Sequence, residues 1–208
     1  TTITPKSLGV SGSTLVITLE SPLRSDQSIK LSYTDPSGNN DTNALQDLAG
    51  NDSPSLSNIS VLNTIAPIIT IKSLFLNNDT GLSSSDFITS IKTQGLWGSL
   101  TKELNAGEKV MISLDNGQNW RQASISTGSK TFILSDVTLT KSDTLLAKVE
   151  DIAGNSGSSF SQAYVLDTFN PTILGAWLDN THLNIVLSEE TFPSDNNPPG
   201  NTMHVSPS

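Results

Sequence analysis

Aspartates placed in turns are the side chains of this sequence with the clearest chemical potential. Asp79 and Asp86 lie seven positions apart, and they come together if the Gly-Ser stretch between them folds back. Asp151 ends a predicted strand near the same pole of the expected fold, and Asp47 and Asp167 are two further candidates. Calcium takes oxygen ligands from carboxylates, amides, carbonyls and water. These five aspartates are therefore the predicted metal ligands, with Ca²⁺ as the expected cofactor.

A second interpretation of the same aspartates needs no metal. Asp and Asn close turns through their own side-chain oxygens, and Asp outnumbers Glu by 14 to 6 in this sequence. The spacing of the acidic residues is not that of an EF-hand loop. At the level of the sequence, a metal site and a set of self-closed turns both remain open.

Catalytic chemistry finds little support in the residue pattern. Glu189 and Glu190 form the only adjacent glutamate pair, and neighbours on a strand point to opposite faces, so we expect a solvated acidic edge. The two histidines, His182 and His204, lie in the final segment, and neither a Gly-x-Ser-x-Gly elbow nor a phosphate-binding loop is present. We therefore expect neither enzymatic activity nor binding of an organic cofactor.

Two tryptophans are candidates for a sugar-binding platform. Trp97 lies between Gly95 and Gly98 in a segment, 93–107, that we expect to be a loop, so it is the candidate for an exposed contact. Trp120 follows a turn and alternates with apolar neighbours, so we expect it to pack in the core or at its rim.

Charge and hydropathy exclude several classes of partner. The net charge of −9 argues against nucleic-acid binding, which needs a basic surface. No apolar run approaches the ~20 residues needed to cross a bilayer. The absence of cysteine excludes a disulfide framework and a Cys-ligated zinc site. We expect no nucleic-acid partner and no membrane span.

The elements that must position these side chains are strands. Alternating apolar and polar residues predict strands over 14–19, 28–33, 110–114, 145–149 and 182–187. Turn-forming clusters separate the strands, and Asp115-Asn116-Gly117 predicts a hairpin turn with positive φ. Short strands with dense turn signals predict an all-β chain built of antiparallel β-sandwiches.

The chain repeats itself at a spacing of 104 residues. At that shift, Asp47 to Asn51 aligns with Asp151 to Asn155, and 11 of the 23 positions from Asp47 to Ile69 are identical. Each copy ends in a strand followed by a short linker with proline, Pro67 or Pro171. A domain-sized repeat of this kind predicts a tandem array.

The linkers divide the chain into three predicted parts. Residues 64–167 have the length and strand content of one complete sandwich. Residues 1–63 are expected to be the C-terminal half of a sandwich repeat, and 168–208 the N-terminal half of the next, since neither closes a core alone. Either the ends are arbitrary boundaries, or the tail of one chain completes the head of another.

Several motifs in order resemble a known family. Residues 64–167 resemble the bacterial Ig-like repeat of large surface adhesins and biofilm-associated proteins, through the segments 79–89, 113–120 and 149–155. Residues 1–63 and 168–208 are similar to the two halves of the repeat found in the cyanobacterial cell-surface swimming protein. Asn63 stands where the second linker has Asp167, which weakens a metal site at that linker.

The resemblance implies tandem Ig-like β-sandwiches that act as a structural spacer in a long adhesin, secreted to the bacterial cell surface. It implies calcium at the joints between domains, and neighbouring repeats of the same chain as partners. Head-to-tail self-association through the half-domains is a further expectation. The alternative function is a carbohydrate- or cell-surface-binding module of the same adhesin, with Trp97 and residues 93–107 as its contact.

Overall fold

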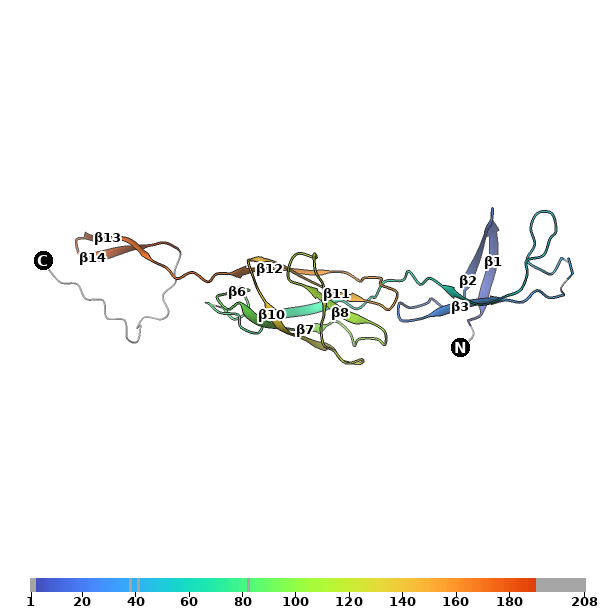
Figure 1. Cartoon of the computed structure of the whole chain (residues 1–208), viewed down its shortest axis with the longest axis horizontal. Helices are drawn as coiled ribbons and strands as arrows, with labels where there is room; N and C mark the ends of the chain where they lie inside the picture. The colour runs from blue at the N-terminus through green and yellow to red at the C-terminus, as the bar shows by residue number, and fades with distance from the viewer. Residues whose placement is uncertain (1–2, 38, 41, 82, 190–208) are drawn as a thin grey trace.

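The described chain consists of strands joined by turns and loops. The computed structural model describes residues 3–37, 39, 40, 42–81 and 83–189, so Glu190 and His204 lie outside the described residues. Three parts follow one another along the long axis of the molecule (Figure 1): an N-terminal segment (3–63), a central domain (64–167) and a C-terminal hairpin (172–188). No helix is present among the described residues, and so none that could span a membrane. The predicted all-β fold is confirmed.

The central domain is a sandwich of two sheets. The first sheet has the order β10-β7-β5 and contains β5 (Ile71–Leu76), β7 (Thr93–Leu100) and β10 (Thr131–Thr138). The second has the order β6-β12-β11-β8-β9 and contains β6 (Ile88–Thr89), β8 (Lys109–Ser113), β9 (Arg121–Gln122), β11 (Asp143–Glu150) and β12 (Phe160–Leu166). The pairs are antiparallel except β6 with β12, which run parallel.

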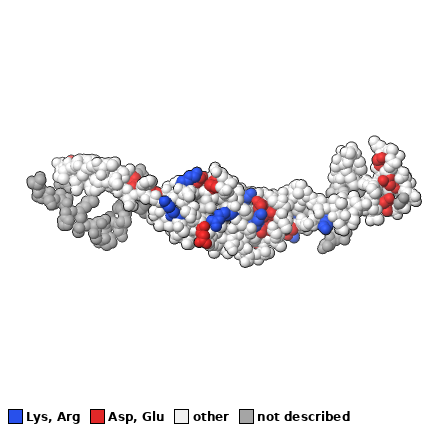
Figure 2. All heavy atoms as spheres, in the orientation of Figure 1, with Lys and Arg blue, Asp and Glu red and all other residues white. Residues whose placement is uncertain are grey.

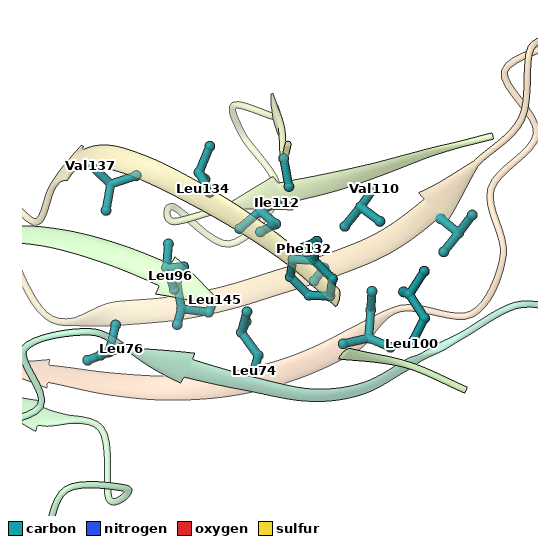
Figure 3. Close-up of a cluster of buried hydrophobic side chains, with 14 of the residues drawn as sticks. Leu74, Leu76, Leu96, Leu100, Val110, Ile112, Phe132, Leu134, Val137 and Leu145 are labelled. Carbon is teal, nitrogen blue, oxygen red and sulfur yellow. The ribbon is translucent and has the colours of Figure 1, made fainter. Parts of the chain in front are cut away.

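The core of the central domain follows from strand alternation. Along β11, Leu145, Ala147 and Val149 point inward and are fully buried, whereas the residues between them are partly exposed. The same alternation on β8 and β10 brings Ile112 and Phe132 into one apolar cluster between the sheets (Figure 3). All the buried hydrophobic residues of the described chain lie between positions 69 and 164. The central domain therefore holds the only closed core of the described residues.

The N-terminal segment forms two separate two-stranded sheets. β1 (Pro5–Ser11) pairs with β2 (Thr14–Leu19), and β3 (Ile29–Tyr33) pairs with β4 (Leu56–Val61). Ser25 is the one buried residue among the described positions of this segment. None of its described apolar side chains is buried, and several, Leu8 and Ile59 among them, are exposed.

The C-terminal hairpin consists of β13 (Ile173–Asp179) and β14 (His182–Leu187). The two strands pair with each other and with no other described strand. Like the N-terminal sheets, the hairpin buries none of its apolar residues. The assignment of 1–63 and 168–208 as halves of sandwich repeats stays a prediction.

Candidate functional site at the module joints

A closed aspartate loop stands at the pole of the central domain that meets the N-terminal segment. Asp151 follows β11, and its side chain is almost fully buried, with 1% of the residue exposed. Its Oδ1 accepts hydrogen bonds from the backbone N–H groups of Ala153 (2.9 Å) and Asn155 (2.8 Å). Its Oδ2 accepts a third from the Asn155 side-chain amide at 2.9 Å. These three donors compensate the burial of the carboxylate.

Two asparagines connect this loop to the linker. The side-chain amide of Asn155 also donates to the backbone carbonyl of Asn63 at 2.8 Å. The side-chain amide of Asn63 in turn donates to the carbonyls of Arg24 (2.8 Å) and Gln27 (3.0 Å) in the N-terminal segment. The linker is therefore fixed by hydrogen bonds on both of its sides.

A buried polar contact joins the N-terminal segment directly to the central domain. The Ser25 hydroxyl donates to Oε1 of Glu108 at 3.0 Å, and both residues are buried. The other carboxylate oxygen of Glu108 accepts from the backbone N–H of Asn105 at 3.2 Å. Because this contact is shielded from water, loss of either partner leaves a buried polar group without a bond.

The repeat copy of the aspartate loop has the same internal bonds in a different setting. Asp47 accepts from the N–H groups of Ala49 (2.8 Å) and Asn51 (2.9 Å) and from the Asn51 side chain (2.9 Å). These hydrogen bonds lower the pKa of Asp47, and the bond from the Asn51 side chain has the largest effect. Unlike Asp151, Asp47 is exposed. The D-x-A-G-N motif thus closes its own turn in both copies.

A carboxylate pair lies at the opposite pole of the central domain. Oδ2 of Asp79 accepts from the backbone N–H of Phe87 at 3.0 Å, and Asp86 accepts from the N–H of Ile88 at 3.1 Å. Among the side-chain atoms of the described residues, Oδ1 of Asp79 is the buried oxygen that has no hydrogen bond. Burial raises the pKa of Asp79, and the nearby negative charge of Asp86 raises it further. An added cation would coordinate the unpartnered oxygen and offset the repulsion between the two carboxylates.

The second linker begins at this same pole. The backbone N–H of Asp167 donates to the carbonyl of Thr89 at 2.9 Å, which continues the parallel pairing of β6 with β12. Oδ1 of Asp167 accepts from the backbone N–H of Phe169 at 3.0 Å. Asn63 makes the equivalent bond to Ile65 in the first linker, also at 3.0 Å.

The predicted location of Asp151 is wrong. The sequence pattern predicts Asp151 at the pole of Asp79 and Asp86, but β11 runs antiparallel to β12, so the end of β11 lies at the other pole, beside Asn63. Nor do the described residues contain any group of three or more His, Cys, Asp or Glu side chains that could hold a metal ion. Of the five predicted ligands, Asp79 and Asp86 are brought together, Asp167 begins the linker at their pole, and Asp47 and Asp151 lie elsewhere.

Sequence reasoning missed a buried amide near the carboxylate pair. The side chain of Gln94, 3% exposed, donates to the carbonyls of Asn78 and Ile91, both at 2.9 Å. The Thr89 hydroxyl also donates to the Asn78 carbonyl, at 2.6 Å. A lone glutamine inside a strand carries no sequence signal of this role. The network fixes the turn that precedes Asp79.

The expected loop around Trp97 is also wrong, because residues 93–100 form β7. Trp97 is nevertheless 47% exposed and stacks on Phe75 of β5, with ring centroids 4.4 Å apart. It borders a shallow groove of about 530 Å³ that also involves Ser124 and Thr131. Trp120 lies at the rim, as expected: its indole N–H donates to the Gly117 carbonyl at 3.0 Å.

Comparison with known families agrees with the architecture. The sequence matches a family described as bacterial Ig-like domain over residues 64–168. Because the match spans half of the chain, the chain belongs to this family. No curated protein matches the sequence. Domains of this family are typically non-catalytic and commonly occur as repeat modules in surface proteins.

Proposed function

We propose that this chain is a spacer segment of a long adhesin secreted to the bacterial cell surface, where stacked domains hold a distal binding region away from the cell. Domains that contact only their neighbours extend a protein in one direction as they are repeated. The domain-sized sequence repeat, the elongated arrangement in Figure 1 and the bacterial Ig-like family support this role. The resemblance of the end segments to the cell-surface swimming protein repeat fits the same surface location.

The observation that carries the proposal is the hydrogen-bonded first joint. A spacer transmits position only when its joints resist bending, and a flexible linker would let the modules rotate freely. Here Ser25 contacts Glu108 directly, while Asn63 is held by the N-terminal segment and by Asn155. Breaking the buried contact should therefore widen the range of angles between the two parts.

Pulsed electron paramagnetic resonance tests this stiffness. The sequence has no cysteine, so spin labels at Lys30→Cys and Lys130→Cys, both exposed, report one distance across the joint. We expect a narrow distance distribution that broadens in Ser25→Ala and stays narrow in the control Ser7→Ala on exposed β1. A parent chain whose distribution is already as broad as that of Ser25→Ala contradicts a stiff joint.

We further propose that Asp79 and Asp86 bind calcium at the second joint. Carboxylates are hard oxygen ligands, and the unpartnered buried oxygen of Asp79 beside a second acidic group supports a cation there. Bound calcium would supply the charge compensation that the protein groups around Asp79 lack. Since this turn adjoins the start of the linker at Asp167, the ion would stiffen the joint on that side.

Thermal unfolding with calcium and with chelator tests the site. We expect calcium to raise the melting temperature of the parent chain, and Asp79→Asn to abolish that increase. In chelator, Asp79→Asn should be more stable than the parent chain at neutral pH, because it removes a buried charge next to Asp86. The control Asp136→Asn, at an exposed position whose positive φ Asn also tolerates, should keep the calcium response. An identical response in Asp79→Asn contradicts the site.

Glycan binding is the second candidate function, and the stacked Trp97–Phe75 pair beside the shallow groove favours it. Exposed aromatic faces are suited to contact apolar sugar faces, and the hydroxyls that border the groove supply hydrogen bonds. A glycan-array signal lost in Trp97→Ala and retained in Trp177→Ala would support this function. The absence of any signal from the parent chain would contradict it.

A further inference from the structure

The hairpins β1–β2 and β13–β14 have the same pattern of strand pairing. In β1–β2 the paired residues include Leu8 with Ile17 and Val10 with Leu15. In β13–β14 every pair recurs 168 positions later, so that Leu8 with Ile17 becomes Ala176 with Ile185. Both ladders also shift register at the same place, after their first pair.

The ends of the two hairpins correspond as well. The tight turn has a residue with positive φ at Gly12 in one hairpin and at Asn180, again 168 positions later, in the other. A backbone bond closes the open end of each hairpin, from Glu20 to Thr4 and from Ser188 to Thr172. The two elements are therefore structural equivalents, although the repeat found in the sequence has a different spacing.

Each hairpin has one apolar face whose side chains are not buried by the described residues. Side chains alternate across a strand, so cross-strand partners share a face. In β1–β2 this face carries Leu8, Val10, Leu15 and Ile17; in β13–β14 it carries Ala176, Leu178, Leu183 and Ile185. Val10 is 74% exposed and Leu178 is 68% exposed. A two-stranded hairpin gains independent stability only when such a face is covered.

The surroundings of the two faces are suited to a β partner. Val10 and Leu15 line a cleft of about 710 Å³ whose other wall is the segment 45–53. The face of β13–β14 contains no charged residue, and the visible surface of this hairpin is almost free of charge (Figure 2). Covering the face of β13–β14 would remove apolar surface from water without desolvating a charge of its own, while Asp47 and Asp52 border the cleft beside β1–β2.

We propose that the apolar face of β13–β14 packs on the apolar face of β1–β2 of a second copy of this chain. Sheets with matched apolar inner faces pack face to face as a sandwich. Within one chain the two hairpins lie at opposite ends of the central domain (Figure 1). Each chain therefore presents β1–β2 to one copy and β13–β14 to another, and the repeated contact generates head-to-tail chains.

Unlike pairing is favoured over pairing of identical hairpins. Leu8 of the first hairpin corresponds to Ala176 of the second. An interface between unlike hairpins contains one leucine and one alanine from this pair of positions. Two copies of β13–β14 would contribute two alanines and bury less apolar surface. This self-association goes beyond the spacer role and does not depend on it.

Analytical ultracentrifugation of the full chain tests the proposal. We expect the weight-average mass of the parent chain to rise with concentration towards the millimolar range. Val10→Asp and Leu183→Asp, one on each face, should abolish the rise. Ser11→Asp and Asn184→Asp, their neighbours on the opposite faces, should retain it.

A mixture of the two disrupted variants distinguishes the geometry from a general loss of folding. Val10→Asp keeps an intact β13–β14 and Leu183→Asp keeps an intact β1–β2. The mixture should therefore form a one-to-one dimer, although neither variant associates alone. Association of either variant by itself would show that identical hairpins pair, and it would overturn the proposal. A parent chain that stays monomeric, or a mixture that does, would overturn it as well.

Discussion

Removal of the Asn155 side chain gives the sharpest test of the first joint. Asn155→Ala deletes the amide that donates both to Asp151 and to the Asn63 carbonyl, and it leaves the backbone N–H in place. Asn119→Ala is the matched control in the same domain, because Asn119 donates in the same way to Asp115, through its backbone N–H (2.8 Å) and its side chain (2.6 Å).

The burial of the accepting carboxylate sets the magnitude of the effect. Asp151 is 1% exposed and loses one of its three donors, so its carboxylate has little contact with water that could replace the amide. A hydrogen bond to a charged group contributes about 1.5–3 kcal/mol and a neutral one about 1 kcal/mol, so we expect Asn155→Ala to lose about 2–4 kcal/mol of unfolding free energy. Around the partly exposed Asp115, water takes the place of the amide, and the loss should be clearly smaller.

Urea unfolding followed by tryptophan fluorescence measures both variants, since Trp97 and Trp120 lie in the central domain. The slope of the transition should stay constant, so that the shift in midpoint reports stability alone. Equal losses in the two variants would refute the reasoning, because burial would then not decide the contribution of these loops. So would a loss in Asn155→Ala of under about 1 kcal/mol, the range of an exposed neutral bond.

Two further predictions concern the central domain. A Cβ at Gly98 would collide with the ring of Phe132 and with the backbone carbonyl of Ser73, so Gly98→Ala should lower the unfolding free energy by about 3 kcal/mol. The control Gly95→Ala should be tolerated, because its Cβ would have its nearest neighbour at 3.5 Å. Thermal unfolding compares the stability of the two variants. The Asn119 side chain, its N–H and the Ser113 hydroxyl lower the pKa of Asp115 from 3.8 to about 2. Because the folded-state pKa is depressed, this stabilisation is present above 3.8 and is lost as the pH falls towards 2, and Asp115→Asn should remove that part of the acid dependence of urea unfolding.

The local chemistry of the turns could be predicted from the sequence because it depends on near neighbours. Asn116 and Gly117 adopt the positive φ that the turn pattern required. The expected strands over 14–19 and 182–187 match β2 and β14 residue for residue. By contrast, no local pattern indicated the positive φ of Phe87 or the two-residue strand that follows it.

The sequence by itself determined the all-β class, the main strands, the repeat and the bacterial Ig-like resemblance of the central domain, because alternation and turn residues encode these locally. Only the tertiary structure decided which aspartates meet, since the direction of β11 relative to β12 places Asp151 and Asp79 at opposite poles. It alone also revealed the Ser25–Glu108 contact and the equivalence of the end hairpins. Both depend on residues far apart in the chain, and no local pattern specifies such distances.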